Sequence, residues 1–307
     1  MLLAALAGGS AVAGQRLARQ YRLNLAAAYT RLAAVDRTTV ITRFGMVEYA
    51  ERGSGEPLLA VHGFFGGCDE ALLSLGSLAA GRRVIAPSRF GYLGSAMPAG
   101  ATVAGQAEAF TALLDELAVD ALDVIAISSG ATSAFQFALR HPERVKHLAV
   151  ISGNLPGGAA AIAPPKAARL VFQDVPMWAL KVFARPVLLR LIGVPEGFPL
   201  AAAESQIISD LIDSFFPVAL KAEGVAFDAF VADPDVNSYP LEALTVPTMI
   251  VHAKDDPLVS YDAARHTAGR IPGAALVSID RGGHLLLGDR ENVGREVAAF
   301  LAGSGGP

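Results

Sequence analysis

Three short segments carry the residue types that a nucleophilic catalyst needs. Ser128 lies in Ala126-Ile127-Ser128-Ser129-Gly130, Asp256 lies in Asp255-Asp256-Pro257, and His284 follows Gly283. A serine hydroxyl becomes a good nucleophile when a histidine removes its proton, and an acidic side chain can hold that histidine in the right orientation. If the fold brings the three segments together, these residues indicate attack on a carbonyl carbon.

The serine segment predicts a nucleophile on a sharp turn between a strand and a helix. In the pattern G-x-S-x-G, the residues two positions from the serine are small because a larger side chain would collide with neighbouring elements. Ala126 and Gly130 meet this need for Ser128, whereas a pattern centred on Ser129 would place Ile127 at a small position. We therefore expect Ser128 to be the nucleophile. A loop serine without a catalytic role is the alternative.

A glycine-rich turn predicts the groups that would stabilise negative charge. His62-Gly63-Phe64-Phe65-Gly66-Gly67 directly follows Leu58 to Val61, a short apolar run typical of a buried strand. Such a turn exposes a backbone N–H, here that of Phe64, which would bind an oxyanion together with the N–H of Ser129. An ordinary turn is the alternative. A phosphate-binding loop is excluded because no Lys-Ser/Thr pair follows.

Apolar runs alternate with helical patterns and predict an α/β architecture. Strands are expected as a hairpin at 39–51 and as buried runs at 58–61, 83–86, 122–127, 147–152, 247–252 and 275–279. Helices are expected at 71–80, 103–117, 261–271 and 291–301, and from the serine turn to Leu139. This order implies a mostly parallel sheet covered by helices on both faces. The three candidate residues follow strands of this sheet, so they are expected at one edge.

The segment 153–244 interrupts this alternation and is predicted to be a helical cap. It has no obvious strand, contains clustered prolines, and shows helical stretches at 177–192 and 203–215. An insertion between two sheet strands is most simply placed over the carboxyl ends of the strands. Its apolar content, which includes the only tryptophan, Trp178, indicates an apolar pocket. Packed core is the alternative for any one aromatic residue.

Composition excludes several classes of protein. The 307 residues carry a net charge of −4 with a pI of about 5.9, and no basic block follows the first part of the chain. No nucleic acid partner is therefore expected. Hydrophobic residues make up 52% of the chain, which is enough for a substantial core. Cys68 is the only cysteine, which excludes an internal disulfide and argues against a cysteine-based metal site.

The amino-terminal segment, residues 1–37, is apolar at its start and basic afterwards. Its first fourteen residues have no charged side chain, and Arg16, Arg19 and Arg22 follow on a helix-like pattern. A spanning helix needs about 20 apolar residues. A short signal anchor, a cleaved signal, and a helix packed on the domain or on a membrane surface all remain open. We expect a cytoplasmic protein that associates loosely with a membrane surface through this segment.

The order of these motifs resembles the α/β-hydrolase fold over residues 38–301. His62-Gly63, Ala126-x-Ser128-x-Gly130, Asp256-Pro257 and Gly283-His284 carry the resemblance, in the family order Ser, Asp, His. It implies a core at 38–152 and 245–303, with Ser128 as nucleophile, His284 as base and Asp256 as the residue that orients the imidazole. Asp256 is preferred because it directly precedes the proline, as in the family. Asp255 is expected to be a solvated turn residue.

The other five histidines are expected to be outside the catalytic group. In this fold the histidine at the position of His62 usually shapes its loop. His252 and His266 are expected to be structural or exposed, and His141 and His147 to lie away from the site. The base is therefore expected to be His284 alone.

The resemblance implies a serine hydrolase that needs no cofactor. Its expected substrate is a small hydrophobic carboxylic ester, thioester or lactone, cleaved through an acyl-enzyme. C–C bond hydrolysis and cofactor-free peroxidation would use the same triad, and a non-catalytic hydrolase-like binding protein is a further alternative. A closer resemblance at 86–93, 128–133 and 282–288 is to bacterial α/β hydrolases of unassigned substrate, many of which have an acid where this chain has Ser88.

Overall fold

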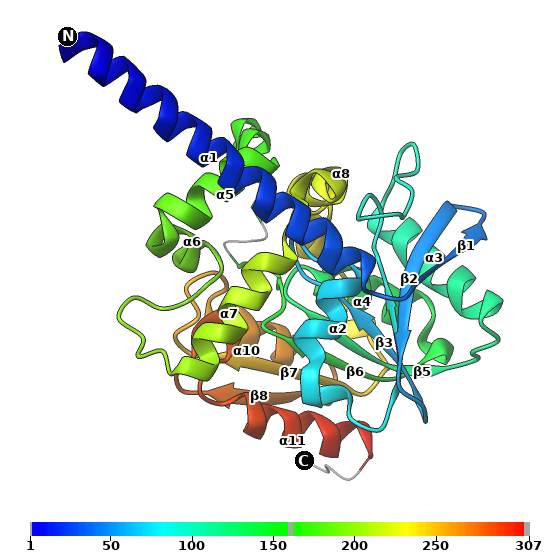
Figure 1. Ribbon diagram of the computed structural model, residues 1–307. Coiled ribbons are helices and arrows are strands. Elements are labelled where there is room, and N and C mark those ends of the chain that lie inside the picture. Colours follow the sequence, from blue (N-terminus) through cyan, green and yellow to red (C-terminus); the bar gives the residue numbers. More distant parts are fainter. Residues whose placement is uncertain (1, 159–161, 304–307) are drawn as a thin grey trace.

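A computed structural model describes residues 2–158 and 162–303. Residue 1 of the predicted amino-terminal segment, residues 159–161 of the predicted cap and residues 304–307 lie outside the described residues. The centre is one eight-stranded sheet with strand order β1-β2-β4-β3-β5-β6-β7-β8 (Figure 1). Its strands are β1 (Arg37–Thr42), β2 (Gly45–Arg52), β3 (Pro57–Val61), β4 (Arg83–Pro87), β5 (Leu122–Ile127), β6 (Val145–Ile151), β7 (Thr248–Ala253) and β8 (Ala275–Ile279).

The sheet is mostly parallel, as predicted. β1 and β2 form the antiparallel hairpin, and β2 also pairs antiparallel with β4. Every other pair of neighbours, from β4 to β8, is parallel. Parallel neighbours need a crossover between them, and helices provide it. The carboxyl ends of β3, β5, β7 and β8 therefore meet at one edge, and each is followed by a loop that carries candidate residues.

Helices cover both faces of the sheet. The described helices are α1 (Leu2–Ala33), α2 (Cys68–Leu75), α3 (Val103–Glu116), α4 (Gly130–Arg140), α5 (Asp174–Phe183), α6 (Arg185–Leu191), α7 (Ala202–Ser214), α8 (Ala222–Phe227), α9 (Asp233–Asp235), α10 (Tyr261–Arg270) and α11 (Arg290–Leu301). Residues of α3, α4 and α10 pack in one core cluster with the sheet, and residues of α2 and α11 pack in a second cluster. These clusters bury the two apolar faces of the sheet.

The described part of the segment between β6 and β7 contains helices, turns and irregular stretches but no strand, and we refer to it as the cap. The continuous helix expected at 177–192 is wrong, because the chain forms α5 and α6 with a break at Ala184. Pro186 stands in the first turn of α6, where its missing N–H and fixed φ are tolerated, but it could not continue α5. Trp178 belongs to a cluster formed mainly by cap residues. Packed core is therefore the correct interpretation of this tryptophan.

The amino-terminal helix α1 packs on the cap with its carboxyl half. The ring of Tyr21 meets the ring of Trp178 edge to face at 5.5 Å, and the indole N–H of Trp178 donates to Asn24 Oδ1 at 2.9 Å. Arg31 donates to the carbonyl of Phe216 at 2.6 Å. The amino half of α1 extends beyond the body of the protein (Figure 1). None of the described helices combines the length and apolar character that crossing a membrane requires.

Candidate active site

Ser128 occupies a strained turn between β5 and α4. Its φ is +52°, in the left-handed region that residues with a side chain rarely adopt. The turn is held by a hydrogen bond from the Ser128 N–H to the carbonyl of Ile151 at 3.0 Å. A Cβ at Gly130 would lie only 2.5 Å from the carbonyl oxygen of Val61. The need for a small residue at 130 is thus steric, as the sequence pattern predicts.

Ser128, His284 and Asp256 form one hydrogen-bonded chain. The Oγ of Ser128 lies 2.8 Å from Nε2 of His284, and Nδ1 of His284 lies 2.8 Å from Oδ2 of Asp256. The second carboxylate oxygen of Asp256 accepts the N–H groups of Leu258 at 2.8 Å and Val259 at 3.2 Å. With Asp256 as acceptor, the ring proton sits on Nδ1 and Nε2 is free to accept the serine proton.

Asp256 is buried and stays ionised. Burial raises its pKa, but the charge and hydrogen bond of His284 and the N–H of Leu258 together hold the pKa below its ordinary value. Nε2 of His252 lies 3.3 Å from Asp256 Oδ2 and 2.9 Å from the carbonyl of Val259. Burial lowers the pKa of His252, so a neutral ring shares its Nε2 proton between these oxygens. The sequence analysis placed His252 among structural residues but did not foresee this contact.

Asp255 lies in a turn and is partly exposed, as predicted, but its carboxylate also has a structural role that the sequence analysis missed. One of its carboxylate oxygens accepts the N–H groups of Gly282 at 2.9 Å and Gly283 at 2.8 Å. These glycines directly precede His284 in the chain. Asp255 therefore anchors the loop that presents the imidazole, while the neighbouring Asp256 contacts the ring itself. Two adjacent acids thus hold the backbone and the side chain of the same residue.

Ser129 does not point at His284. Its hydroxyl donates to Oδ1 of Asp233 at 2.8 Å, and both side chains are buried. Burial, and after it the charge of Asp228, raise the pKa of Asp233 well above its ordinary value. Within the described residues, neither the Ser129 N–H nor the Phe64 N–H donates a hydrogen bond. Buried backbone donors usually have partners, so these two N–H groups are available for a ligand.

The peptide group between Gly63 and Phe64 is held from behind. The N–H of Arg89 donates to Nε2 of His62 at 3.0 Å, so the ring proton of His62 is on Nδ1 and donates to the carbonyl of Gly63 at 2.8 Å. Burial lowers the pKa of His62 well below its ordinary value, which keeps the ring neutral. The guanidinium of Arg89 also lies 3.4 Å from the same carbonyl. Because the carbonyl and the Phe64 N–H share one peptide plane, these contacts fix the direction of that N–H. His62 therefore shapes its loop, as the sequence analysis predicts.

A buried ion pair connects the loop after β4, which carries Arg89, to the cap. Both terminal nitrogens of Arg89 lie 2.5 Å from the carboxylate of Asp228, which also accepts the hydroxyl of Tyr92. Asp228 begins a π-helical turn that ends directly before Asp233. The side chains of Asp228 and Asp233 are both buried in the core. The sequence analysis missed this network. The only signal was the charged Arg89 in an otherwise apolar loop, because its partner lies 139 residues away.

An apolar cavity of about 400 Å³ opens above Ser128. Its wall comes from the glycine-rich turn, from the loop of His284 and from the cap, and it includes Phe64, Phe172, Met177 and Leu188. The polar side chains among its described lining residues are those of Glu70, Ser74, Ser128 and His284, with no lysine or arginine. Burial raises the pKa of Glu70. The described wall therefore offers no positive side chain to a ligand.

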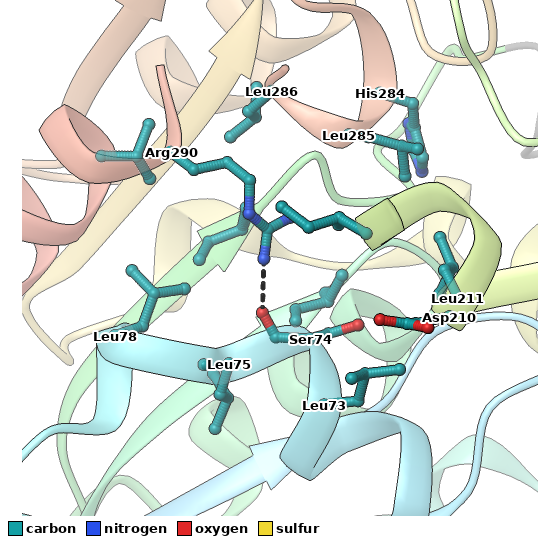
Figure 2. Close-up of a pocket in the computed structure, with 15 residues that line it drawn as sticks. Leu73, Ser74, Leu75, Leu78, Asp210, Leu211, His284, Leu285, Leu286 and Arg290 are labelled. Atoms are coloured by element: carbon teal, nitrogen blue, oxygen red, sulfur yellow. Dashed lines mark hydrogen bonds between the residues drawn. The ribbon is translucent and has the colours of Figure 1, made fainter. Parts of the chain in front are cut away.

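A second cavity, of about 310 Å³, adjoins the first and is also lined by His284 (Figure 2). It shares Ser74 and His284 with the first cavity, and its wall also carries Asp210 and Arg290. Arg290 donates to the carbonyl of Ser74 at 2.9 Å, as the dashed line in Figure 2 shows. Burial lowers the pKa of Arg290. Two compartments of different polarity therefore meet at the imidazole.

The remaining histidines lie away from this site, as predicted. His141, which follows the far end of α4, contacts Glu108, and His147, near the start of β6, contacts Asp123. His266 is exposed on α10. In the part of the chain that the structure describes, no group of three or more His, Cys, Asp or Glu side chains is placed to hold a metal ion.

Comparisons with known proteins agree with this architecture. The family model for the alpha/beta hydrolase fold matches residues 56–291, and the chain belongs to this family. An uncharacterized hydrolase of Bacillus subtilis, YcgS, is 28% identical over 274 residues, which cover 84% of this chain and 94% of the relative. A 2-hydroxymuconate semialdehyde hydrolase of Pseudomonas putida is 28% identical and covers 82% of this chain and 89% of its own length.

The solved structures show the same fold. An alpha/beta hydrolase fold protein from Nakamurella multipartita superposes with a TM-score of 0.67 at 27% sequence identity. The match covers 88% of this chain and the whole of that structure. The fold predicted from the motif order is therefore confirmed, and the coarse assignment of this chain as a hydrolase is supported. Neither comparison fixes the bond that is cleaved.

Proposed function

We propose that the protein is a serine hydrolase that cleaves a carboxylic ester, thioester or lactone with an apolar acyl or alcohol part. One observation carries this proposal. The hydroxyl of Ser128, the imidazole of His284 and the carboxylate of Asp256 are joined at 2.8 Å contacts on the wall of an apolar cavity. This geometry activates a serine for attack on a carbonyl.

In the proposed mechanism, Ser128 Oγ attacks the carbonyl carbon while Nε2 of His284 takes the serine proton. Asp256 remains ionised and stabilises the imidazolium through its hydrogen bond to Nδ1. The tetrahedral intermediate then expels the alcohol or thiol, which receives the proton from His284. A water molecule, deprotonated by the same nitrogen, attacks the acyl-enzyme and releases the acid together with free Ser128.

The oxyanion of each tetrahedral intermediate would accept the N–H groups of Phe64 and Ser129. Their lack of any other acceptor among the described residues supports this role. Preorganised donors of this kind typically contribute about 100 to 1,000-fold in rate each. The contacts of His62 and Arg89 on one donor peptide, and of Asp233 on the serine that carries the other donor, would keep the pair rigid.

The polarity of the larger cavity favours an uncharged substrate. A carboxylate placed there would lose its hydration without gaining a cation, which is unfavourable by several kcal/mol, on the order of the penalty for a buried unpaired ion. An alkyl or aryl chain would instead bury apolar area against the aromatic and aliphatic wall. We therefore expect the acyl or alcohol chain in the larger cavity to be neutral.

Hydrolysis of a C–C bond beside a carbonyl is the second candidate. The Pseudomonas putida relative is named for 2-hydroxymuconate semialdehyde, which carries a carboxylate. In this chain, Arg290 in the second cavity is a cation within the compartment that adjoins His284, and it would be the partner of such a group. This candidate uses the same triad, so the substrate must distinguish the two.

A paired substrate assay distinguishes ester hydrolysis from C–C bond hydrolysis. The purified protein and Arg290→Met are supplied with p-nitrophenyl butyrate and, separately, with a 2-hydroxy-6-oxo-dienoate. We expect wild-type hydrolysis of the ester at a rate that changes less than about threefold in Arg290→Met, and no turnover of the dienoate. Turnover of the dienoate that is lost in Arg290→Met would instead establish the second candidate.

A further inference from the structure

The cap turns an apolar surface to the solvent. Leu170 has an exposed fraction of 74%, Phe183 of 62% and Leu191 of 58%, and Val171, Val175 and Val187 are also exposed. We call these six residues the cap face. A surface helix normally directs its apolar stripe at the core. A contiguous exposed apolar surface marks a site of interaction with another molecule or a membrane.

Helical spacing groups four of these residues on two helices. On α5, Val175 and Phe183 are eight residues apart, and on α6, Val187 and Leu191 are four apart, so each pair lies on one side of its helix. Trp178 on α5 and Leu188 on α6 are buried, and the ring of Trp178 contacts the ring of Phe183 edge to face, with the ring centroids 5.8 Å apart. Each helix therefore carries exposed apolar residues next to apolar residues that are buried against the protein.

The segment that carries the cap face is basic, although the protein is acidic and two of the five cations of this segment are paired with acids elsewhere in the cap, Lys181 with Asp213 and Arg190 with Glu196. Residues 162–192 contain five lysines and arginines but only one acid, Asp174, whereas the whole chain has a net charge of −4. The carboxylate of Asp174 already accepts the N–H of Val218 at 2.6 Å. Lys166 and Arg169 are exposed, and no described acid forms an ion pair with either. Such a surface is complementary to one that is apolar inside and anionic outside.

The cap face also contains the mouth of the active-site cavity. Val171 and Leu191 are exposed and at the same time line the cavity above Ser128. The amino half of α1 leaves the body beside α5 (Figure 1), and the first fourteen residues of the chain have no charged side chain. An apolar chain that enters at this mouth therefore reaches Ser128 without crossing a polar surface.

From these observations we propose that the cap face docks on an anionic lipid bilayer and admits to the cavity an apolar ester dissolved in that bilayer. Docking rests on the cap surface alone, and the delivery of an ester rests also on the function proposed above. The aliphatic and aromatic side chains insert at the level of the lipid headgroups, while Lys166 and Arg169 lie against lipid phosphates. A second copy of the chain on the same face is the competing occupant.

Vesicle sedimentation with the full-length chain tests docking. The probes are vesicles of phosphatidylcholine with phosphatidylglycerol and vesicles of phosphatidylcholine alone. The variant Leu170→Glu with Phe183→Glu puts two acids on the cap face without altering a residue that lines the cavity. Ile41→Glu is the matched control, because Ile41 has an exposed fraction of 74%, equal to that of Leu170, and lies on β1 at the far edge of the sheet.

We expect the wild-type protein and Ile41→Glu to bind the anionic vesicles, and the double variant to bind them at least about tenfold more weakly, because two large apolar side chains no longer insert. Binding to phosphatidylcholine alone should be weaker for all three proteins. Equal binding by the double variant and Ile41→Glu would overturn the proposal. So would wild-type dimerisation in solution that the double variant abolishes, since a second copy would then cover the face.

Two substrates separate docking from catalysis. Hydrolysis of dissolved p-nitrophenyl butyrate should change less than about twofold in the double variant, whereas hydrolysis of a long-chain ester held in anionic vesicles should fall by at least about tenfold. If both rates stayed at the wild-type level, the route through the bilayer would be refuted while the ester hydrolase remained. If neither substrate were cleaved by the wild-type protein, the proposed function would fail and vesicle binding alone would decide docking.

Discussion

Replacing Asp256 with asparagine tests how the imidazole is held. In the structure, one oxygen of Asp256 accepts the N–H groups of Leu258 and Val259, and the other oxygen accepts from Nδ1 of His284. The two backbone donors require an acceptor, so the amide oxygen of the asparagine takes their side. Its NH₂ group is then left facing Nδ1 of His284, which can receive its hydrogen bond only without a proton.

The size of the expected fall in kcat follows from this change of tautomer. When Nδ1 accepts a hydrogen bond, the ring proton moves to Nε2, which then donates to Ser128 Oγ and can no longer remove the serine proton. The same exchange in a serine protease triad lowers kcat by about 10⁴-fold, which corresponds to about 5 kcal/mol of activation free energy. We therefore expect kcat of Asp256→Asn for p-nitrophenyl butyrate to fall by about 10⁴-fold.

Asp255→Asn is the matched control. Asp255 is the adjacent acid, and the oxygen that accepts the Gly282 and Gly283 N–H groups can be replaced by an amide oxygen. We expect kcat of this variant to fall by less than about tenfold. Initial rates and circular dichroism are measured for both variants. A folded Asp256→Asn protein with more than a tenth of wild-type kcat, or equal losses in the two variants, would refute the proposed orientation of His284.

Two further substitutions test the framework of the site. Asp228→Ala leaves the buried guanidinium of Arg89 without its counterion and should lower the free energy of unfolding by about 3–5 kcal/mol, whereas loss of the exposed acid in Asp262→Ala should change it by less than about 1 kcal/mol. Guanidinium chloride titrations measure both, and similar values would contradict the importance of the buried pair. Gly130→Ala brings a Cβ to 2.5 Å from a backbone carbonyl and should destabilise the protein by about 1–3 kcal/mol. Gly269→Ala, in open space on α10, should stabilise the protein by about 0.5–1 kcal/mol. If Gly130→Ala were instead the more stable of the two variants, the turn at Ser128 would have room for the extra methyl group.

Local sequence patterns were sufficient to predict the strands of the central sheet and the edge at which their loops meet. Buried strands such as Leu122 to Ile127 are short apolar runs that need no distant information, and loops after parallel strands must meet at one edge of the sheet. For this reason the proximity of Ser128, Asp256 and His284 could be predicted. The break between α5 and α6 was missed although Pro186 signalled it, because apolar residues continue on both sides.

Contacts between distant segments could not be read in the same way. The pairing of Arg89 with Asp228 joins a core loop to the cap, and each residue alone has the pattern of an exposed charge. The adjacent acids Asp255 and Asp256 differ only in the direction that the turn gives their side chains. The position before Pro257 indicated Asp256 as the partner of His284, but no local pattern predicted the contact of Asp255 with the N–H groups of Gly282 and Gly283. Contact of the amino-terminal segment with a membrane surface, and the catalytic roles of the site residues, remain predictions.

The most direct test of the central proposal is hydrolysis of p-nitrophenyl esters from acetate to laurate by the wild-type protein and Ser128→Ala, with fluorophosphonate labelling of both. We predict that the wild-type protein is labelled at Ser128 and prefers esters whose chain fills the apolar cavity. Ser128→Ala should lose the label, and its kcat should fall by about a millionfold. A Ser128→Ala protein that keeps its label or its activity would contradict the assignment, as would a wild-type protein that shows neither.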